Sequence, residues 1–115
     1  MAKKLAQLMQ SVQTISVHGN MENEISLLTY DSRNVTADAV FFAIKGTQVD
    51  GHNYITNVIE KGCKAIVCEV LPAELNTEIT FIQVSNTSES MALMAAEFYN
   101  HPSKKLILVA VTGTN

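Results

Sequence analysis

The apolar positions of this chain alternate between a helical spacing and short continuous runs. In a helix that lies on a core, apolar residues recur at positions i, i+3, i+4 and i+7. The sequence has this spacing at residues 5–12, 54–59 and 91–98. Runs of apolar and β-branched residues bounded by glycine, proline or polar turns instead indicate strands. We expect strands at residues 13–17, 25–30, 40–44, 65–70, 79–84 and 106–111.

Two of the predicted helices have recognisable end signals. Gly62 follows the second helix and is typical of the position just after a helix end. Asn86, with Glu89 three residues later, resembles a capping box that begins the third helix. Because Ala92 and Leu93 add apolar side chains outside the main stripe of that helix, we expect it to be buried on two sides.

The order of the elements predicts the fold class. After residue 39 the expected order is strand, helix, strand, strand, helix, strand. Such alternation predicts an α/β protein, a layered Rossmann-like domain with a partly parallel sheet. The earlier strands look antiparallel, so the sheet should be mixed. The pattern breaks at residues 100–105, and we expect one domain at 1–104 and the first strand of a second domain at 105–115.

Composition narrows the class of protein. The chain has 115 residues, of which 47% are hydrophobic and 17% charged, as in an ordinary globular domain. Its net charge of -3 argues against a nucleic-acid or anionic-membrane surface. No long apolar segment follows the start, so we expect no signal peptide, no transmembrane span and a cytoplasmic protein.

The cysteines and histidines do not indicate a metal or nucleophilic site. Cys63 and Cys68 are too few for a disulfide framework, and we expect both to be buried, reduced thiols. His18 and His101 have no cysteine or carboxylate neighbour at ligand spacing, so no metal site is expected.

Two polar loops that follow predicted strands are candidate ligand contacts. They lie at residues 29–33 and 45–52. In open α/β sheets ligands bind where such loops meet at strand ends. Gly46 and Gly51 would let the backbone approach a ligand closely. The Ser32 hydroxyl and a glutamine amide suit a ligand rich in oxygen, such as a nucleotide or a diphosphate.

The last ten residues suggest a second, incomplete site. The apolar run 106–111 is followed by Thr112-Gly113-Thr114-Asn115, the first part of a glycine turn. A phosphate-binding loop of the G-x-x-G-K-[ST] kind begins with a strand and such a turn. We therefore expect this chain to be the front piece of a longer nucleotide-using enzyme, interrupted within its ATP site.

Ordered motifs across nearly the whole chain resemble the amino-terminal domain of the Mur ligases, which build the bacterial cell-wall peptide. The motifs are Asp31-Ser32-Arg33-x-Val35, Phe41-x-Ala43-x-x-Gly46 and Asp50-Gly51-His52-x-x-Ile55. Two further segments are more similar to the MurE ligases than to the MurF ligases. These segments are Phe98-Tyr99-x-His101-Pro102-Ser103 and Val111-Thr112-Gly113-Thr114-Asn115.

The resemblance implies a function for each loop. A MurE ligase uses ATP and Mg²⁺ to activate UDP-MurNAc-L-Ala-D-Glu as an acyl phosphate and then adds a diamino acid in peptidoglycan synthesis. The first domain would bind the UDP-precursor through Tyr30, Ser32, Thr47, Gln48 and Val49. The incomplete ATP loop would be Gly113, Thr114 and Asn115. No catalytic residue falls within the chain, so the isolated chain should be inactive.

Several of the same residues also have a purely structural interpretation. Asp31 and Arg33 are expected to pair beside their turn. Asp50 should accept helix N–H groups, with His52 in a structural role, and Lys45 should be solvated.

Three alternative functions stay open. A MurF-type ligase, which adds a dipeptide to a longer precursor, is the nearest. A non-catalytic nucleotide-sugar-binding module is the second, and a Gly-Lys-Thr sequence after Asn115 would exclude it. A dinucleotide oxidoreductase is the weakest alternative because no G-x-G-x-x-G motif follows the first strand.

Overall fold

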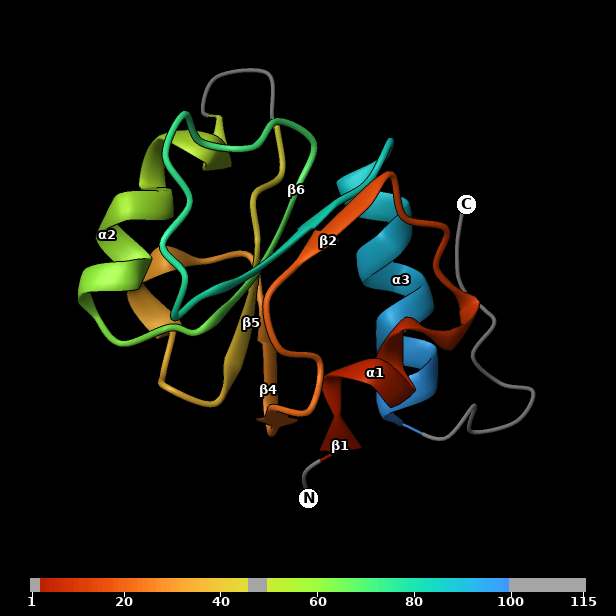
Figure 1. Ribbon diagram of the computed structural model, residues 1–115. Coiled ribbons are helices and arrows are strands. Elements are labelled where there is room, and N and C mark those ends of the chain that lie inside the picture. The colour runs from red at the N-terminus through yellow and green to blue at the C-terminus, as the bar shows by residue number, and fades with distance from the viewer. Residues whose placement is uncertain (1–2, 46–49, 100–115) are drawn as a thin grey trace.

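A five-stranded sheet forms the centre of the protein. The computed structural model describes residues 3–45 and 50–99 (Figure 1). The strands lie in the order β2-β7-β6-β5-β4, with β4, β5, β6 and β7 parallel and β2 antiparallel at one edge. This confirms the predicted mixed, partly parallel sheet. The strands are β2 Ser16–His18, β4 Leu27–Thr29, β5 Ala39–Phe42, β6 Ala65–Cys68 and β7 Thr80–Gln83.

Strands β5 and β6 are apolar at every position because both faces of the sheet are covered. In β5, Val40 and Phe42 point to one face while Phe41 and the following Ala43 point to the other. All four side chains are fully buried. A strand buried on both faces needs a continuous apolar run rather than an alternating one, which explains why these segments were recognisable in the sequence.

Helices cover the two faces, giving three layers. Figure 1 shows α2 on one side of the sheet and α1 with α3 on the other. The helices are α1 Leu5–Leu8, α2 Ile55–Glu60 and α3 Thr87–Phe98, with 3₁₀ turns η1 Met9–Ser11, η2 Ser32–Asn34 and η3 Gly51–Tyr54. A small antiparallel pair, β1 Lys3–Lys4 and β3 Glu24–Ile25, lies apart from the main sheet.

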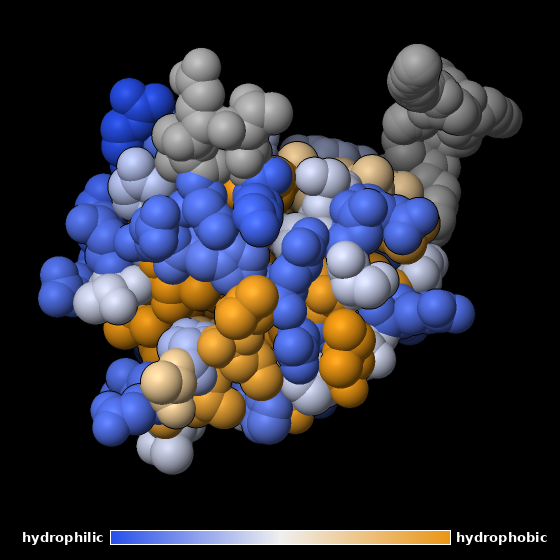
Figure 2. All heavy atoms as spheres, turned by 90° about the horizontal axis from the view of Figure 1, so that it is seen from above, coloured by the Kyte–Doolittle hydropathy of each residue, from blue (hydrophilic) through white to orange (hydrophobic). Residues whose placement is uncertain are grey.

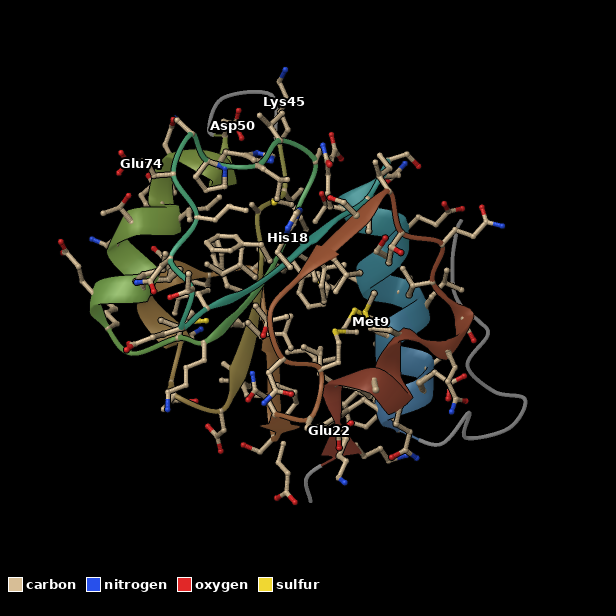
Figure 3. All side chains as sticks on the ribbon, in the orientation of Figure 1. Met9, His18, Glu22, Lys45, Asp50 and Glu74 are labelled. Carbon is tan, nitrogen blue, oxygen red and sulfur yellow. The ribbon has the colours of Figure 1, made fainter. Side chains whose placement is uncertain are left out.

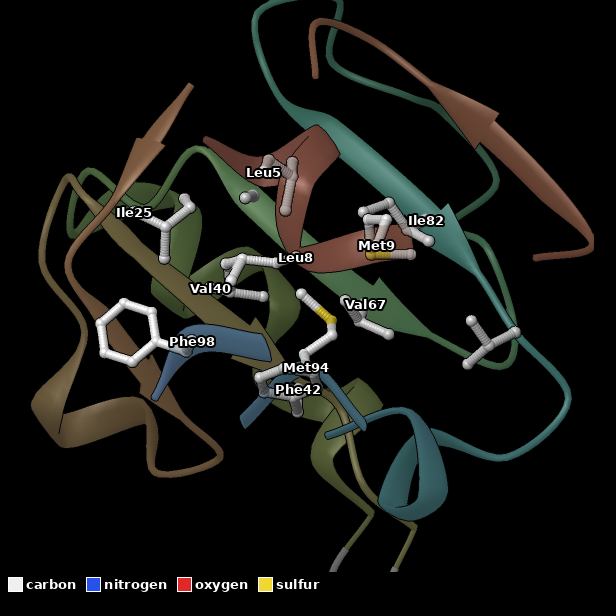
Figure 4. Packing of buried hydrophobic residues seen from close by; sticks show 12 residues of the cluster. Leu5, Leu8, Met9, Ile25, Val40, Phe42, Val67, Ile82, Met94 and Phe98 are labelled. Carbon is white, nitrogen blue, oxygen red and sulfur yellow. The ribbon is translucent and has the colours of Figure 1, made fainter. Parts of the chain in front are cut away.

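The larger core lies between the sheet and the α1–α3 layer. Leu8 of α1 and Met94 of α3 meet the sheet residues Val40, Phe42 and Val67 (Figure 4). All five are fully buried. Removing one such side chain from water contributes about 1.5–3 kcal/mol, so this cluster holds both helices on the sheet.

The smaller core lies under α2 and includes both cysteines. Cys63 and Cys68 pack with Phe41, Ile66 and Val58 and are free thiols, as expected. Burial raises the pKa of the Cys63 thiol. Burial, together with the nearby Glu69 charge, raises the pKa of Cys68 to about 11. At neutral pH both are therefore protonated and serve as small apolar residues.

The predicted helix ends are confirmed. Asn86 caps α3 by accepting a hydrogen bond from the Glu89 backbone N–H at 2.9 Å. Gly62, just after α2, has φ of +102°, a conformation that residues with a Cβ rarely adopt.

Two sequence expectations were wrong. The third helix is not buried on two sides, because Ala92 is exposed and Leu93 is 37% exposed while only the opposite face packs on the sheet. The strand expected at 25–30 is divided at Ser26, whose hydroxyl and backbone N–H both donate to Asp38. Its two halves, β3 and β4, belong to different sheets. The strand expected at 106–111 and the boundary at 100–105 lie outside the described residues.

Candidate functional site

The first polar loop begins where β4 ends. Thr29 is buried, and its hydroxyl oxygen accepts a hydrogen bond from the Asp31 backbone N–H at 3.0 Å. The chain then turns into η2, which begins at Ser32. Tyr30, between them, is 63% exposed. The buried threonine thus fixes the backbone while the tyrosine ring stays on the surface.

Asp31 and Arg33 form a compact pair around Ser32. One Asp31 oxygen, Oδ1, accepts hydrogen bonds from the Arg33 backbone N–H at 2.9 Å and from Arg33 Nε at 3.0 Å. The other, Oδ2, accepts from Arg33 Nη2 at 2.9 Å. These hydrogen bonds from the Arg33 side chain and backbone lower the pKa of Asp31 to about 2. The expected structural role of the pair is confirmed, and it fixes the turn that presents Ser32.

Lys61 contributes a contact that the sequence did not predict. Its Nζ donates to the Ser32 carbonyl oxygen at 2.9 Å, across a separation of 29 residues. Lys61 directly follows α2, which packs near η2. A basic residue beside the helix-ending Gly62 was visible in the sequence, but nothing local connected it with Ser32.

The second polar loop is closed at its base by a backbone bridge. Lys45 and Asp50 pair in an antiparallel β-bridge, and the Gly51 N–H donates to the Ile44 carbonyl at 2.8 Å. Lys45 is exposed, as expected. Figure 3 shows Lys45 and Asp50 at the same end of the molecule. Thr47, Gln48 and Val49, which the resemblance assigns to the precursor, lie outside the described residues.

Gly51 is required because the backbone passes very close to the end of β5. A Cβ built on Gly51 would lie 2.7 Å from the Ile44 nitrogen and 3.0 Å from two Ala43 backbone atoms. Such distances are shorter than a carbon atom tolerates. The Asp-Gly-His motif therefore has a steric basis at its second position.

His52 joins this loop to the end of β6. Asp50 Oδ1 accepts from the His52 backbone N–H at 3.0 Å and lies 2.7 Å from His52 Nδ1. His52 Nε2 accepts from the backbone N–H groups of Glu69 at 3.0 Å and Val70 at 3.1 Å. The His52 backbone and side-chain contacts lower the pKa of Asp50, with a smaller effect of the Lys45 charge. The structural roles expected for Asp50 and His52 are confirmed.

The remaining predicted site residues are not described. Gly113, Thr114 and Asn115 of the incomplete ATP loop fall outside the described range. Within residues 3–45 and 50–99 no group of three histidine, cysteine or acidic residues is placed to hold a metal ion. In that same part of the chain no helix has the length and apolar character to cross a membrane. Viewed from the end that carries Lys45 and Asp50, the surface shows apolar areas between hydrophilic side chains (Figure 2).

Comparison with known proteins assigns the family. A sequence model described as "Mur ligase family, catalytic domain" matches residues 24–99. The chain belongs to the Mur ligase family. The resemblance seen in the Asp31-Ser32-Arg33 and Asp50-Gly51-His52 motifs is thereby confirmed.

Mur ligases with a named substrate are similar over nearly the whole chain. The UDP-N-acetylmuramoyl-L-alanyl-D-glutamate–2,6-diaminopimelate ligase of Bacteroides fragilis is 46% identical over 112 residues, covering 97% of this chain and 23% of that protein. The ligase of the same name from Clostridioides difficile is 44% identical over 112 residues, again 97% and 23%. The chain thus spans about a quarter of the length of these relatives.

Solved Mur ligase structures share the fold. A MurF crystal structure from Acinetobacter baumannii aligns with a TM-score of 0.76 and 25% identity, covering 90% of this chain and 22% of that one. MurF from Thermotoga maritima in complex with ADP aligns with a TM-score of 0.55 and 26% identity, covering 64% and 17%. The layered α/β architecture is therefore that of a Mur ligase domain.

Proposed function

We propose that this chain is the UDP-precursor-binding amino-terminal domain of an ATP-dependent Mur ligase of the MurE type. The whole ligase would add a diamino acid to UDP-MurNAc-L-Ala-D-Glu in peptidoglycan synthesis. The observation that carries the proposal is the 46% identity over 97% of the chain to a ligase whose name specifies that precursor and 2,6-diaminopimelate. The names of the relatives make 2,6-diaminopimelate the first amino acid to test.

Sequence identity favours the MurE type over the MurF type. The relatives named as diaminopimelate ligases are 40–46% identical, whereas the MurF structures are 24–26% identical. A MurF-type domain of the same architecture remains the second candidate, because a fold alone does not decide the substrate.

Within this proposal the first polar loop binds the uridine end of the precursor. The exposed Tyr30 ring offers a flat apolar surface on which a nucleobase can stack. Ser32 offers a hydroxyl on a turn held by the Asp31–Arg33 pair and by Lys61. A binding group held in place this way loses little entropy when the ligand arrives.

The second polar loop would contact the same ligand through Thr47, Gln48 and Val49. Its base is fixed on the sheet at Lys45, Asp50 and Gly51, which flank those three residues in the sequence. The role of both loops is positioning: binding of the UDP end holds the distant D-glutamyl carboxylate near the site of ATP chemistry.

ATP and Mg²⁺ would act in the whole ligase and not through the described residues. They supply activation of the carboxylate and neutralise phosphate charge when bound. We propose that residues Gly113, Thr114 and Asn115 begin the ATP loop, that the domain boundary lies at 104–105, and that the 115-residue chain alone is inactive. The soluble precursor and ATP make the cytoplasm the expected location.

Calorimetric titration with UDP tests the proposal. We expect UDP to bind this chain weakly and Ser32→Ala to lower the affinity by roughly fivefold to tenfold, the effect of one lost hydrogen bond. Ser88→Ala, an exposed serine on α3, is the matched control and should bind like the unaltered protein. Equal affinities for Ser32→Ala and the control would remove Ser32 from the site.

A second titration separates the two ligase types. Binding of UDP-MurNAc-dipeptide is compared with binding of the tripeptide precursor, using a protein that includes the remaining ligase domains. Preference for the dipeptide precursor supports the MurE type, and preference for the tripeptide precursor supports the MurF type.

A further inference from the structure

We propose that His52 is a positioning residue that fixes the base of the second polar loop on the carboxyl end of β6. In this role it is a neutral imidazole with its proton on Nδ1. The inference rests on the proposed function, because the loop base borders the residues assigned to UDP.

The hydrogen bonds around His52 determine its tautomer. Nε2 faces two backbone N–H groups, those of Glu69 at 3.0 Å and Val70 at 3.1 Å. A backbone N–H can only donate, so Nε2 must accept and carries no proton. Nδ1 lies 2.7 Å from the Asp50 carboxylate, which only accepts, so Nδ1 carries the proton. If Nε2 carried a proton, its N–H and the backbone N–H groups of Glu69 and Val70 would face one another with no acceptor between them.

The segment that donates to His52 Nε2 is itself held in place by the other hydrogen bonds of Glu69. The Glu69 carbonyl accepts from Gln83 Nε2 at 3.1 Å. Its carboxylate oxygen Oε2 accepts from the Thr87 backbone N–H at 2.9 Å and from the Thr87 hydroxyl at 3.2 Å. His52 therefore bonds to a segment that is tied to β7 and to the start of α3.

Residues 50 and 51, at the base of the loop, have little freedom to move independently of His52. Asp50 is bonded to both the backbone N–H and the ring of His52. Gly51 lies against Ala43 and Ile44 without space for a Cβ. The His52 side chain is only 13% exposed. A displacement of the ring must therefore displace residues 50 and 51, which lead directly from Val49 in the sequence.

Contacts of this kind matter for binding because they orient the groups that touch the ligand. A small displacement of a positioning element weakens binding without any loss of ligand contacts. In the described part of the chain His52 is hydrogen-bonded to Asp50, Glu69 and Val70, and its effect on the loop is exerted through Asp50 and Gly51.

Two conservative variants separate the acceptor role of His52 Nε2 from the donor role of Nδ1. His52→Gln places an amide oxygen near the position of Nε2 and can still accept from Glu69 and Val70. His52→Asn places an amide N–H near Nδ1, keeps the donor to Asp50 and does not reach β6. We expect His52→Asn to lower UDP affinity about tenfold and His52→Gln to lower it by less than about threefold. His18→Asn, on the exposed edge strand β2, is the matched control and should leave affinity unchanged.

NMR provides readouts that need no ligand. Ring ¹⁵N shifts should show a bare Nε2 and a protonated Nδ1, and amide exchange at Glu69 and Val70 should be faster in His52→Asn but not in His52→Gln. A protonated Nε2, unchanged exchange, or equal UDP affinity of His52→Asn and the unaltered protein would overturn the inference. Absence of UDP binding by the unaltered protein, with the expected tautomer and exchange, would instead overturn the part of the proposed function that has this chain bind UDP by itself.

Discussion

At the residue scale, Asp31 shows how one carboxylate organises a loop by local hydrogen bonds. It accepts from the backbone, Nε and Nη2 of Arg33, two residues away. Such short-range pairing is readable from sequence because the partners are adjacent whatever the rest of the fold does. The Lys61 contact with Ser32 spans 29 residues and could not be inferred in the same way.

The pKa of Asp31 provides a direct test of this pair. Its pKa is about 2, below the ordinary 3.8, mainly because the Arg33 side chain donates to the ionised form. A carboxyl whose pKa is lowered on folding stabilises the protein above its unfolded pKa, and that contribution is lost as the pH falls through the folded value. In Arg33→Met we expect an NMR titration to show the Asp31 pKa rising towards 3.8.

Asp38 serves as the internal control in the same titration. Its pKa is lowered by hydrogen bonds from Ser26 and Thr36, with no part played by Arg33. The Arg33→Met change should leave the lowered pKa of Asp38 unchanged. If Asp31 still titrates near its original pKa in the variant, the Arg33 pair does not hold the loop.

At the element scale, the helix ends and the main apolar stripe of each helix were predictable, whereas the burial of the other face of α3 was predicted wrongly. Asn86 and Gly62 act on backbone groups that are close to them in the sequence, so the structure has the helix ends that these residues predict. Whether Leu93 is covered depends on what the rest of the chain places against it. The division of the expected strand at Ser26 likewise depends on Asp38, twelve residues away. Tertiary contacts decided both cases.

The cap at Asn86 should be measurable in the stability of the protein. Asn86→Ala leaves the Glu89 N–H without its partner and is expected to lower the free energy of unfolding by about 1 kcal/mol. Ser88→Ala lies two residues after Asn86, on the exposed side of the helix, and should change stability by less than about 0.5 kcal/mol. Urea unfolding monitored by circular dichroism gives both values, and equal effects would argue against a capping role.

At the scale of the whole molecule, the parallel sheet explains how much of the candidate site was predictable. Loops that follow parallel strands come out at the same edge, so the two polar loops could be assigned to one ligand before the fold was known. The long-range contacts that hold these loops in place could not be predicted from the sequence. The backbone N–H groups of Glu69 and Val70 donate to His52 across 17 and 18 residues of sequence, and no periodic pattern marks such pairs.

The separation of core and loops leads to a final prediction about Leu8 and Leu93. Leu8 is fully buried between the sheet and α3, whereas Leu93 is 37% exposed on α3. Leu8→Ala should lower the free energy of unfolding by about 2–5 kcal/mol, and Leu93→Ala by less than about 1 kcal/mol. The first loss is a large fraction of the roughly 5–15 kcal/mol that stabilises a typical domain.

The same two variants test whether stability and ligand binding are separable. Leu8 belongs to the core on the α1–α3 face, while Lys61 and His52, which hold the polar loops, flank α2 on the other face. The folded fraction of Leu8→Ala should therefore bind UDP with unchanged affinity in a titration well below its unfolding temperature. Equal losses of stability in the two variants would mean that the outer side of α3 is packed after all. A lower UDP affinity in folded Leu8→Ala would mean that the α1–α3 core, and not only the loop contacts, sets the geometry of the site.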